Sequence, residues 1–218
     1  MRIRLSRTHF PVTALGPGRR VGIWMQGCSF ACPGCVSRDT WTPDGGLTRD
    51  VQELADWIAT FCATGDGVDG VTISGGEPTE QPEALHDLIT ELDRLRSDNV
   101  FTGDVLCYTG CDIAELLDRC PWAPGMIDAV ITGRFRIELP TDLVWRGSAN
   151  QEIIPLTELG RRRYAEHVDR IATSPQLQFA VTDESVWMIG IPRRGDLQRL
   201  EAALRTDGVT LQETSWRP

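Results

Sequence analysis

The sequence predicts an α/β fold: a partial, open barrel of the (βα)6 type with parallel strands, followed by a small C-terminal ββαβ extension. Short apolar runs rich in β-branched residues alternate with segments of helical periodicity, which is typical of a parallel sheet with right-handed crossovers. Four such units precede Gly133, too few for a closed eight-stranded barrel. We expect ligands at the carboxyl ends of the strands, where the sequence places its glycine-rich turns.

The individual elements follow from the spacing of apolar residues. Each expected strand is an apolar run that ends just before a turn, at residues 21–26, 70–74, 105–108 and 127–131. Each expected helix repeats apolar residues every three or four positions, at residues 49–62, 82–96 and 113–117. We expect Thr48 to cap the first helix and Pro82 to open the second.

The pattern changes at residue 177. Two apolar runs look like a hairpin around Asp183-Glu184, and a helix at 196–204 and a last strand at 209–211 follow. We therefore divide the chain into a core, residues 1–175, and the ββαβ extension, residues 176–218. The strands of this extension present alternating faces that could pair with another chain, so we expect it to recognise a partner.

Composition and charge exclude several classes of protein. The chain has 22 Lys and Arg against 31 Asp and Glu, a formal net charge of −9. An acidic chain lacks the basic footprint of a general nucleic-acid binder. No apolar run approaches the length of a membrane span, and the N-terminus lacks the apolar core of a signal peptide. We expect a cytoplasmic protein with no nucleic-acid or membrane partner.

Three of the seven cysteines lie within eight residues: Cys28, Cys32 and Cys35, in a C-x3-C-x2-C spacing. In a reducing compartment this density indicates a metal site before a disulfide framework. Thiolates bind iron–sulfur clusters, and a cubane cluster needs four ligands, so three cysteines leave one iron open to a substrate. The alternatives are a structural zinc site with a fourth ligand from elsewhere, or three unliganded thiols.

A second motif follows the expected strand at 70–74. Gly75 and Gly76 allow close backbone approach and unusual dihedral angles. Glu77 offers a carboxylate that can accept hydrogen bonds from an ammonium group. Alone, Gly75-Gly76-Glu77-Pro78 fits an ordinary turn before a helix. After the cysteine triplet, however, it resembles the radical S-adenosylmethionine (SAM) superfamily, whose signature is this pairing in this order.

The resemblance implies a [4Fe–4S] cluster on the three cysteines, with SAM on the open iron. One electron cleaves SAM to methionine and a 5′-deoxyadenosyl radical, which abstracts a hydrogen atom. No catalytic side chain is then needed beyond the cluster and SAM, because the protein supplies orientation, cluster tuning and water exclusion. The residues implied to bind the methionine end of SAM are Gly75, Gly76, Glu77 and Pro78. Weaker candidates for the ribose or carboxylate are Ser74, Thr109 and Asn150.

Further segments are similar to the branch that activates anaerobic ribonucleotide reductase, a glycyl radical enzyme. They are Gly34 before the third cysteine, Trp41, Tyr108-Thr109-Gly110, and residues 128–135 and 146–151. The branch implies a glycine of a partner enzyme as target and flavodoxin or ferredoxin as electron donor. Two alternatives stay open: a radical SAM enzyme modifying a small molecule or peptide, like 7-carboxy-7-deazaguanine synthase, and a non-catalytic iron–sulfur or zinc binding module.

The chain also departs from that branch. The resemblance covers roughly residues 21–157, and the chain continues to Pro218. The other four cysteines, Cys62, Cys107, Cys111 and Cys120, are expected not to bind the cluster, since core packing accounts for buried thiols. The C-x3-C spacing of Cys107 and Cys111 leaves a second metal site open.

Overall fold

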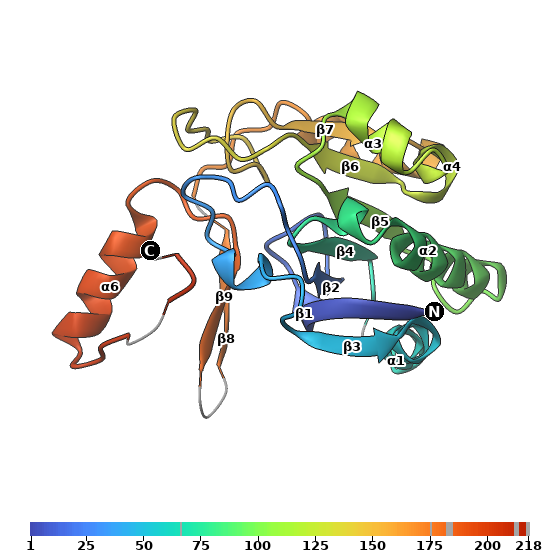
Figure 1. Ribbon diagram of the computed structural model, residues 1–218, viewed down its shortest axis with the longest axis horizontal. Helices are drawn as coiled ribbons and strands as arrows, with labels where there is room; N and C mark the ends of the chain where they lie inside the picture. The colour runs from blue at the N-terminus through green and yellow to red at the C-terminus, as the bar shows by residue number, and fades with distance from the viewer. Residues whose placement is uncertain (66, 175, 182–184, 212–213, 217–218) are drawn as a thin grey trace.

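The computed structural model describes residues 1–65, 67–174, 176–181, 185–211 and 214–216. A seven-stranded sheet runs through its centre in the order β3-β1-β2-β4-β5-β6-β7. In Figure 1 helices α1 to α4 lie on one side of this sheet and the C-terminal elements on the other. The strands are β1 Arg2–Val12, β2 Arg20–Met25, β3 Leu47–Asp50, β4 Gly70–Gly75, β5 Asp104–Tyr108, β6 Ala129–Thr132 and β7 Glu152–Pro155.

Four neighbouring strands, β2, β4, β5 and β6, run parallel. Strands β1 and β3 are antiparallel additions at one edge, and β7 is an antiparallel addition at the other. The mostly parallel α/β core matches the prediction, but the count of six βα units is not confirmed. The three antiparallel strands were not predicted, because their sequences mix charged with apolar residues. Such a mixture is possible in an edge strand, since one of its faces is solvated.

Four helices cover one face of the sheet with their apolar sides: α1 Val51–Ala63, α2 Pro82–Ser97, α3 Ile113–Arg119 and α4 Ala123–Met126. Helix α5 Glu158–Tyr164 packs on the opposite face, where Tyr164 contacts the cluster around Leu106 and Ile131. Short 3-10 turns are η1 Arg38–Thr40, η2 Pro78–Glu80 and η3 Ala165–His167. Helix α2 opens at Pro82 as predicted. Helix α1 is capped by Asp50, whose carboxylate accepts from the Gln52 N–H, and not by Thr48. Thr48 pairs with Arg4 in the β3–β1 ladder, so the chain stays extended for two residues longer than predicted.

The opposite face of the sheet is closed at the amino ends of its strands by a buried charged network. The Arg20 guanidinium donates to Asp104 Oδ1 at 2.7 Å and to the Thr72 hydroxyl at 2.6 Å, and neither charged side chain is exposed. Arg163 and the Tyr164 hydroxyl also donate to Asp104. A buried ion pair is tolerated only when its charges are fully hydrogen-bonded, as they are here. The open end of this face is therefore the carboxyl end.

The C-terminal part begins with an antiparallel hairpin, β8 Leu177–Val181 and β9 Val186–Gly190, followed by α6 Asp196–Thr206. These three elements match the prediction, although the turn at Asp183-Glu184 lies outside the described residues. The strand predicted at 209–211 is absent from the described residues. Instead, the Val209 N–H donates to Leu204 O at 2.8 Å and so closes the end of α6.

Candidate functional site

The cysteine triplet lies on the loop after β2, at the carboxyl edge of the parallel strands. The first residues of the loop are held by hydrogen bonds to neighbouring segments. Its first residue, Gly27, donates from N–H to Thr40 O at 2.8 Å. The N–H and hydroxyl of Ser29 both donate to Glu80, at 2.7 and 2.5 Å. We call residues 27–37 the cluster loop, and these bonds fix where it begins.

Phe30 anchors the cluster loop from the side. Its ring lies between two guanidinium groups, 4.2 Å from that of Arg134 and 5.5 Å from that of Arg119. Arg134 is itself held by two 3.1 Å hydrogen bonds to Glu115. A side chain at Gly110 would meet the Phe30 ring at 2.5 Å, so the turn after β5 also touches this loop. This packing was not predicted, because nothing in the spacing of these residues along the chain indicates that they meet.

The cysteine sulfurs are half-buried and face backbone N–H groups. The Ser37 N–H donates to Cys35 Sγ at 3.4 Å. N–H groups of Phe30 and Ala31 favour the thiolate of Cys28, and the Phe135 N–H does the same for Cys32. N–H···S bonds of this kind are the means by which proteins tune iron–sulfur clusters.

Electrostatics at these sulfurs favour a cationic ligand. Burial, with a smaller contribution from Glu77 and Glu80, raises the pKa of Cys28 to about 11. Burial and then the neighbouring Cys35 raise the pKa of Cys32. Thiols with such pKa values stay protonated near neutral pH unless a metal binds them. Within the described residues, no three His, Cys, Asp or Glu side chains converge on one ion-sized centre.

The glycine turn after β4 packs directly against the start of the cluster loop. The Gly76 N–H donates to Met25 O at 2.8 Å, and the Glu77 N–H donates to Gly27 O at 2.7 Å. A Cβ on Gly76 would overlap the Gly27 carbonyl, and Gly75 has a φ of +109°. Only glycine fits such a close approach. The structure therefore brings the two sequence motifs together.

The Glu77 carboxylate accepts hydrogen bonds from groups of the protein itself, whereas an ammonium group was predicted as its partner. It is 1 % exposed, and its Oε1 accepts from the Thr79 N–H at 3.0 Å and the Thr109 hydroxyl at 2.8 Å. Its Oε2 accepts from the Gly110 N–H at 2.7 Å. The carboxylate thus ties the turn after β4 to the turn after β5. Its contact with an ammonium group stays a prediction.

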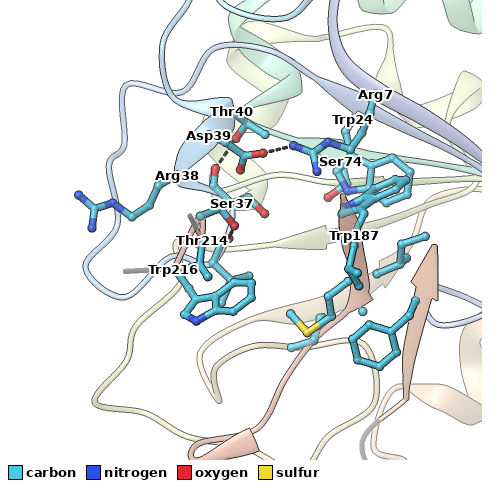
Figure 2. Close-up of a pocket in the computed structure, with 18 of the residues that line it drawn as sticks. Arg7, Trp24, Ser37, Arg38, Asp39, Thr40, Ser74, Trp187, Thr214 and Trp216 are labelled. Carbon is cyan, nitrogen blue, oxygen red and sulfur yellow. Dashed lines mark hydrogen bonds and ion pairs between the residues drawn. The ribbon is translucent and has the colours of Figure 1, made fainter. Parts of the chain in front are cut away.

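The other candidates lie around the same carboxyl edge. Pro78 is buried at the start of η2, and Ser74 lines a cavity beside Trp24 (Figure 2). Asn150 donates from Nδ2 to Arg134 O at 2.9 Å, while its Oδ1 is buried with no partner in the described chain. Tyr108 Oη and Arg146 Nε are buried and unpartnered in the same way. Tyr108 and Arg146 lie in segments that carry the family resemblance, but neither residue was predicted to have a role in the site.

Comparisons with known proteins identify the family of this chain. Residues 14–154 match the family described as the 4Fe-4S single cluster domain. The anaerobic ribonucleoside-triphosphate reductase-activating protein of Pasteurella multocida is 33% identical over 150 residues, which cover 66% of this chain and 91% of that protein. Its counterpart in Vibrio cholerae is 32% identical over 148 residues, covering 66% and 94%. The chain belongs to this 4Fe-4S family. The predicted similarity to the proteins that activate anaerobic ribonucleotide reductase is confirmed.

Two further findings concern the extent of the family match and the likeness to a solved structure. The family match ends at residue 154, so β8, β9 and α6 lie beyond it. A solved structure, QueE from Escherichia coli, aligns with 97% of this chain and 79% of that chain at a TM-score of 0.41 and 16% identity. None of the helices in the described residues is long and apolar enough to cross a membrane.

Proposed function

We propose that this chain is a radical SAM activase that removes a hydrogen atom from a glycine of a partner glycyl radical enzyme. The observation that supports it best is the similarity to reductase-activating proteins over more than nine tenths of their length. The partner class, an anaerobic ribonucleotide reductase, follows from the names of those relatives. Flavodoxin or ferredoxin is the proposed electron donor, and the cytoplasm, where thiols stay reduced, is the proposed location.

The residues present fit a [4Fe–4S] cluster held by Cys28, Cys32 and Cys35. Their sulfurs share one preformed loop and face N–H donors. When bound, the cluster supplies the electron that cleaves SAM to methionine and a 5′-deoxyadenosyl radical, and this radical takes the hydrogen atom. The protein positions the reactants and excludes water, and no side chain acts as a general base.

Unpartnered polar atoms near the cluster loop fit the second cofactor, SAM. Buried polar groups are normally hydrogen-bonded, so Asn150 Oδ1, Tyr108 Oη and Arg146 Nε mark a place for a polar ligand. We assign the methionine end of SAM to Gly75, Gly76, Glu77 and Pro78. We assign its ribose and carboxylate to Ser74, Thr109 and Asn150.

Anaerobic reconstitution tests the proposal. The protein should bind about four irons, as a cubane cluster requires. With dithionite or flavodoxin as reductant it should convert SAM to 5′-deoxyadenosine, slowly without the partner. Zinc in place of iron, or an intact cluster with no 5′-deoxyadenosine from any reductant, would contradict the proposal.

Glu77→Ala sharpens the assignment of the glycine turn. Removing this carboxylate releases Thr109 and Gly110, so SAM affinity should fall tenfold to hundredfold, roughly 1.5–3 kcal/mol. Iron content should stay unchanged, because the carboxylate is assigned to the turns and not to iron. Glu158→Ala, at the exposed partner of Arg161 on α5, serves as control and should keep SAM affinity.

A further inference from the structure

Two segments that are far apart in the sequence meet beside the second cysteine of the cluster loop. Residues 133–136, after β6, lie near the loop after β2 in Figure 1, and the Arg134 guanidinium lies 4.2 Å from the ring of Phe30. Phe30 precedes Cys32 by two residues. Burial raises the pKa of Cys32 most, whereas the Phe135 N–H and the Arg134 guanidinium both act to lower it. One short segment thus brings a hydrogen-bond donor and a positive charge to the same cysteine.

Hydrogen bonds to the backbone hold the segment that carries Arg134. The Gly133 N–H donates to Cys111 O at 2.8 Å, and the Gly133 carbonyl accepts from Gln151 Nε2 at 2.9 Å. The Arg134 carbonyl accepts from Asn150 Nδ2 at 2.9 Å. These three bonds on two adjacent residues give the Arg134 side chain a defined starting point beside the cluster loop.

The guanidinium end of Arg134 is held by a two-pronged hydrogen bond. Its Nη1 and Nη2 donate to the two carboxylate oxygens of Glu115, both at 3.1 Å. Glu115 is itself fixed, because its carboxylate accepts from the Asp112 N–H and completes the capping box of α3. The two side chains of the ion pair are 45% and 37% exposed, so water and salt screen their charges. Arg134 therefore has a fixed position and a charge that Glu115 balances in part.

The surroundings of Cys28 are negatively charged, in contrast to those of Cys32. Burial raises the pKa of Cys28 to about 11, and Glu77 and Glu80 add to the rise. The whole chain carries a formal net charge of −9. Net charge and hydrogen bonds to the sulfurs set the reduction potential of an iron–sulfur cluster, and negative surroundings make it harder to add an electron. Arg134 is the positive charge that acts against this effect at Cys32.

We infer that Arg134 raises the reduction potential of the cluster by placing its charge beside Cys32, and that Phe30 and Glu115 position this charge. The inference rests on the proposed function, in which one electron passes from flavodoxin or ferredoxin to the cluster. The donor is oxidised by one electron, and no proton moves, since a guanidinium stays protonated. A higher potential makes this transfer more favourable. Arg134 thus serves electron uptake and not SAM binding.

A redox titration of the anaerobically reconstituted holoprotein tests the inference. It is run without SAM and followed by visible absorption and electron paramagnetic resonance. Arg134→Gln removes the charge and keeps a polar side chain. At a fixed solution potential the ratio of reduced to oxidised cluster should fall about three- to tenfold, where tenfold corresponds to about 59 mV. The shift should be the same at about pH 6.5 and about pH 8.5, because no proton is involved, and smaller at about 1 M salt.

Glu115→Gln should shift the potential in the opposite direction. It removes the balancing carboxylate and leaves Arg134 in place, so the ratio of reduced to oxidised cluster should rise. A glutamine at this position still completes a capping box, so α3 should keep its N-terminus. Because this variant retains the positive charge, it decides the question even where Arg134→Gln fails to hold iron.

Two further variants separate charge from structure. Arg134→Lys keeps the charge and loses the two-pronged hydrogen bond, so it should restore most of the potential. A merely structural arginine would give iron loss in both Arg134→Lys and Arg134→Gln, with no change in potential. Arg161→Gln, at an exposed ion pair on α5, is the matched control and should leave the potential unchanged.

Three results would overturn the inference: an unchanged potential in Arg134→Gln with normal iron content, a fall of the potential in Glu115→Gln, or an equal shift in Arg161→Gln. The proposed function fails separately. If the potential shifts as expected in a protein that makes no 5′-deoxyadenosine, the role of Arg134 is supported and the proposed function is contradicted.

Discussion

The parallel sheet and the C-terminal hairpin are built from similarly apolar strands, yet they are buried to different degrees. All six residues of β2 are buried, whereas only Ile189 is buried in β8 and β9 together. Helix α6 has no buried residue at all, whereas α2 has six. The sheet is covered on both faces, and the hairpin is covered on one.

This difference in burial indicates that stability and binding depend on different parts of the chain. Burial of a large apolar side chain contributes about 1.5–3 kcal/mol, so the sheet and its helices hold most of the stability. They keep the cluster loop and the glycine turn in fixed positions. The hairpin is attached by Trp187 on Trp24, at 4.5 Å between ring centroids, and by Gln178 on the backbone of β1. Elements with little buried surface are those that proteins use for binding and movement.

The largest effect is expected in the core, at the cysteine triplet. Replacing Cys28, Cys32 or Cys35 by Ala should abolish the cluster and 5′-deoxyadenosine formation, because each is assigned to a different iron. Iron analysis and visible absorption measure the loss. The double variant Cys107→Ser and Cys111→Ser should keep all its iron. If it lost about half, these two residues would form a second metal site.

The buried ion pair should come next. Asp104→Asn leaves Arg20 buried without its counter-charge, so the free energy of unfolding should fall by about 3–5 kcal/mol. Urea unfolding measures the change, and Asp98→Asn, at the exposed partner of Arg94, is the control that should leave stability unchanged. A small effect of Asp104→Asn would mean that water reaches the amino end of the sheet.

Matched isoleucines compare the two regions directly. Ile73→Ala in β4 should lower the free energy of unfolding by about 2–5 kcal/mol. Ile189→Ala in β9, also a buried isoleucine, should loosen the hairpin and leave the main unfolding transition in place. Hydrogen exchange should report lost protection in β8 and β9 alone. A chain ended before β8 should likewise still bind SAM. If Ile189→Ala shifted the main transition as far as Ile73→Ala, core and hairpin would be one cooperative unit.

The smallest effect concerns alkaline pH. Burial raises the pKa of Cys120 to about 11, and it raises the pKa of Cys107 well above the usual 9. The folded state therefore keeps protons that the unfolded chain loses, so stability is complete below pH 9 and falls as pH rises through 11. Cys120→Ala should flatten the fall of melting temperature between pH 8 and 10.5, and Cys62→Ala should flatten it less. The hairpin has no cysteine, so its loosening should not follow this profile.

The sequence predicted those features that depend on a local pattern of one residue type. Apolar runs identified β2, β4, β5 and β6, and the spacing of cysteines and glycines identified the two motifs that the fold brings together. Edge strands such as β1 were missed, because an alternating pattern with arginines looks like a solvated segment until its partners are known. Residues 209–211 were predicted to form a strand, but Val209 instead closes the end of α6 with a hydrogen bond to Leu204.

The side-chain partners in the site were not predicted either, because they come from segments that are distant in the sequence. Glu77 looked like a ligand to an ammonium group, and only the fold reveals that Thr109 and Gly110 reach its carboxylate first. Phe30 gave no signal, because its two arginines come from segments about 90 and 100 residues further along the chain. Spacing along a chain indicates which chemistry is possible, whereas such contacts depend on how distant segments meet.

The contacts that hold the cluster loop have a consequence for what happens when the protein loses its iron in the cell. Small zinc domains unfold when their metal leaves, since the metal supplies most of their folding energy. Here the contacts of Phe30 with two arginines and of Ser29 with Glu80 hold the loop through protein groups. We therefore expect a chain that has lost its iron to oxygen to keep its fold. Such a chain should recover its cluster when iron, sulfide and reductant are supplied, without new synthesis of the protein.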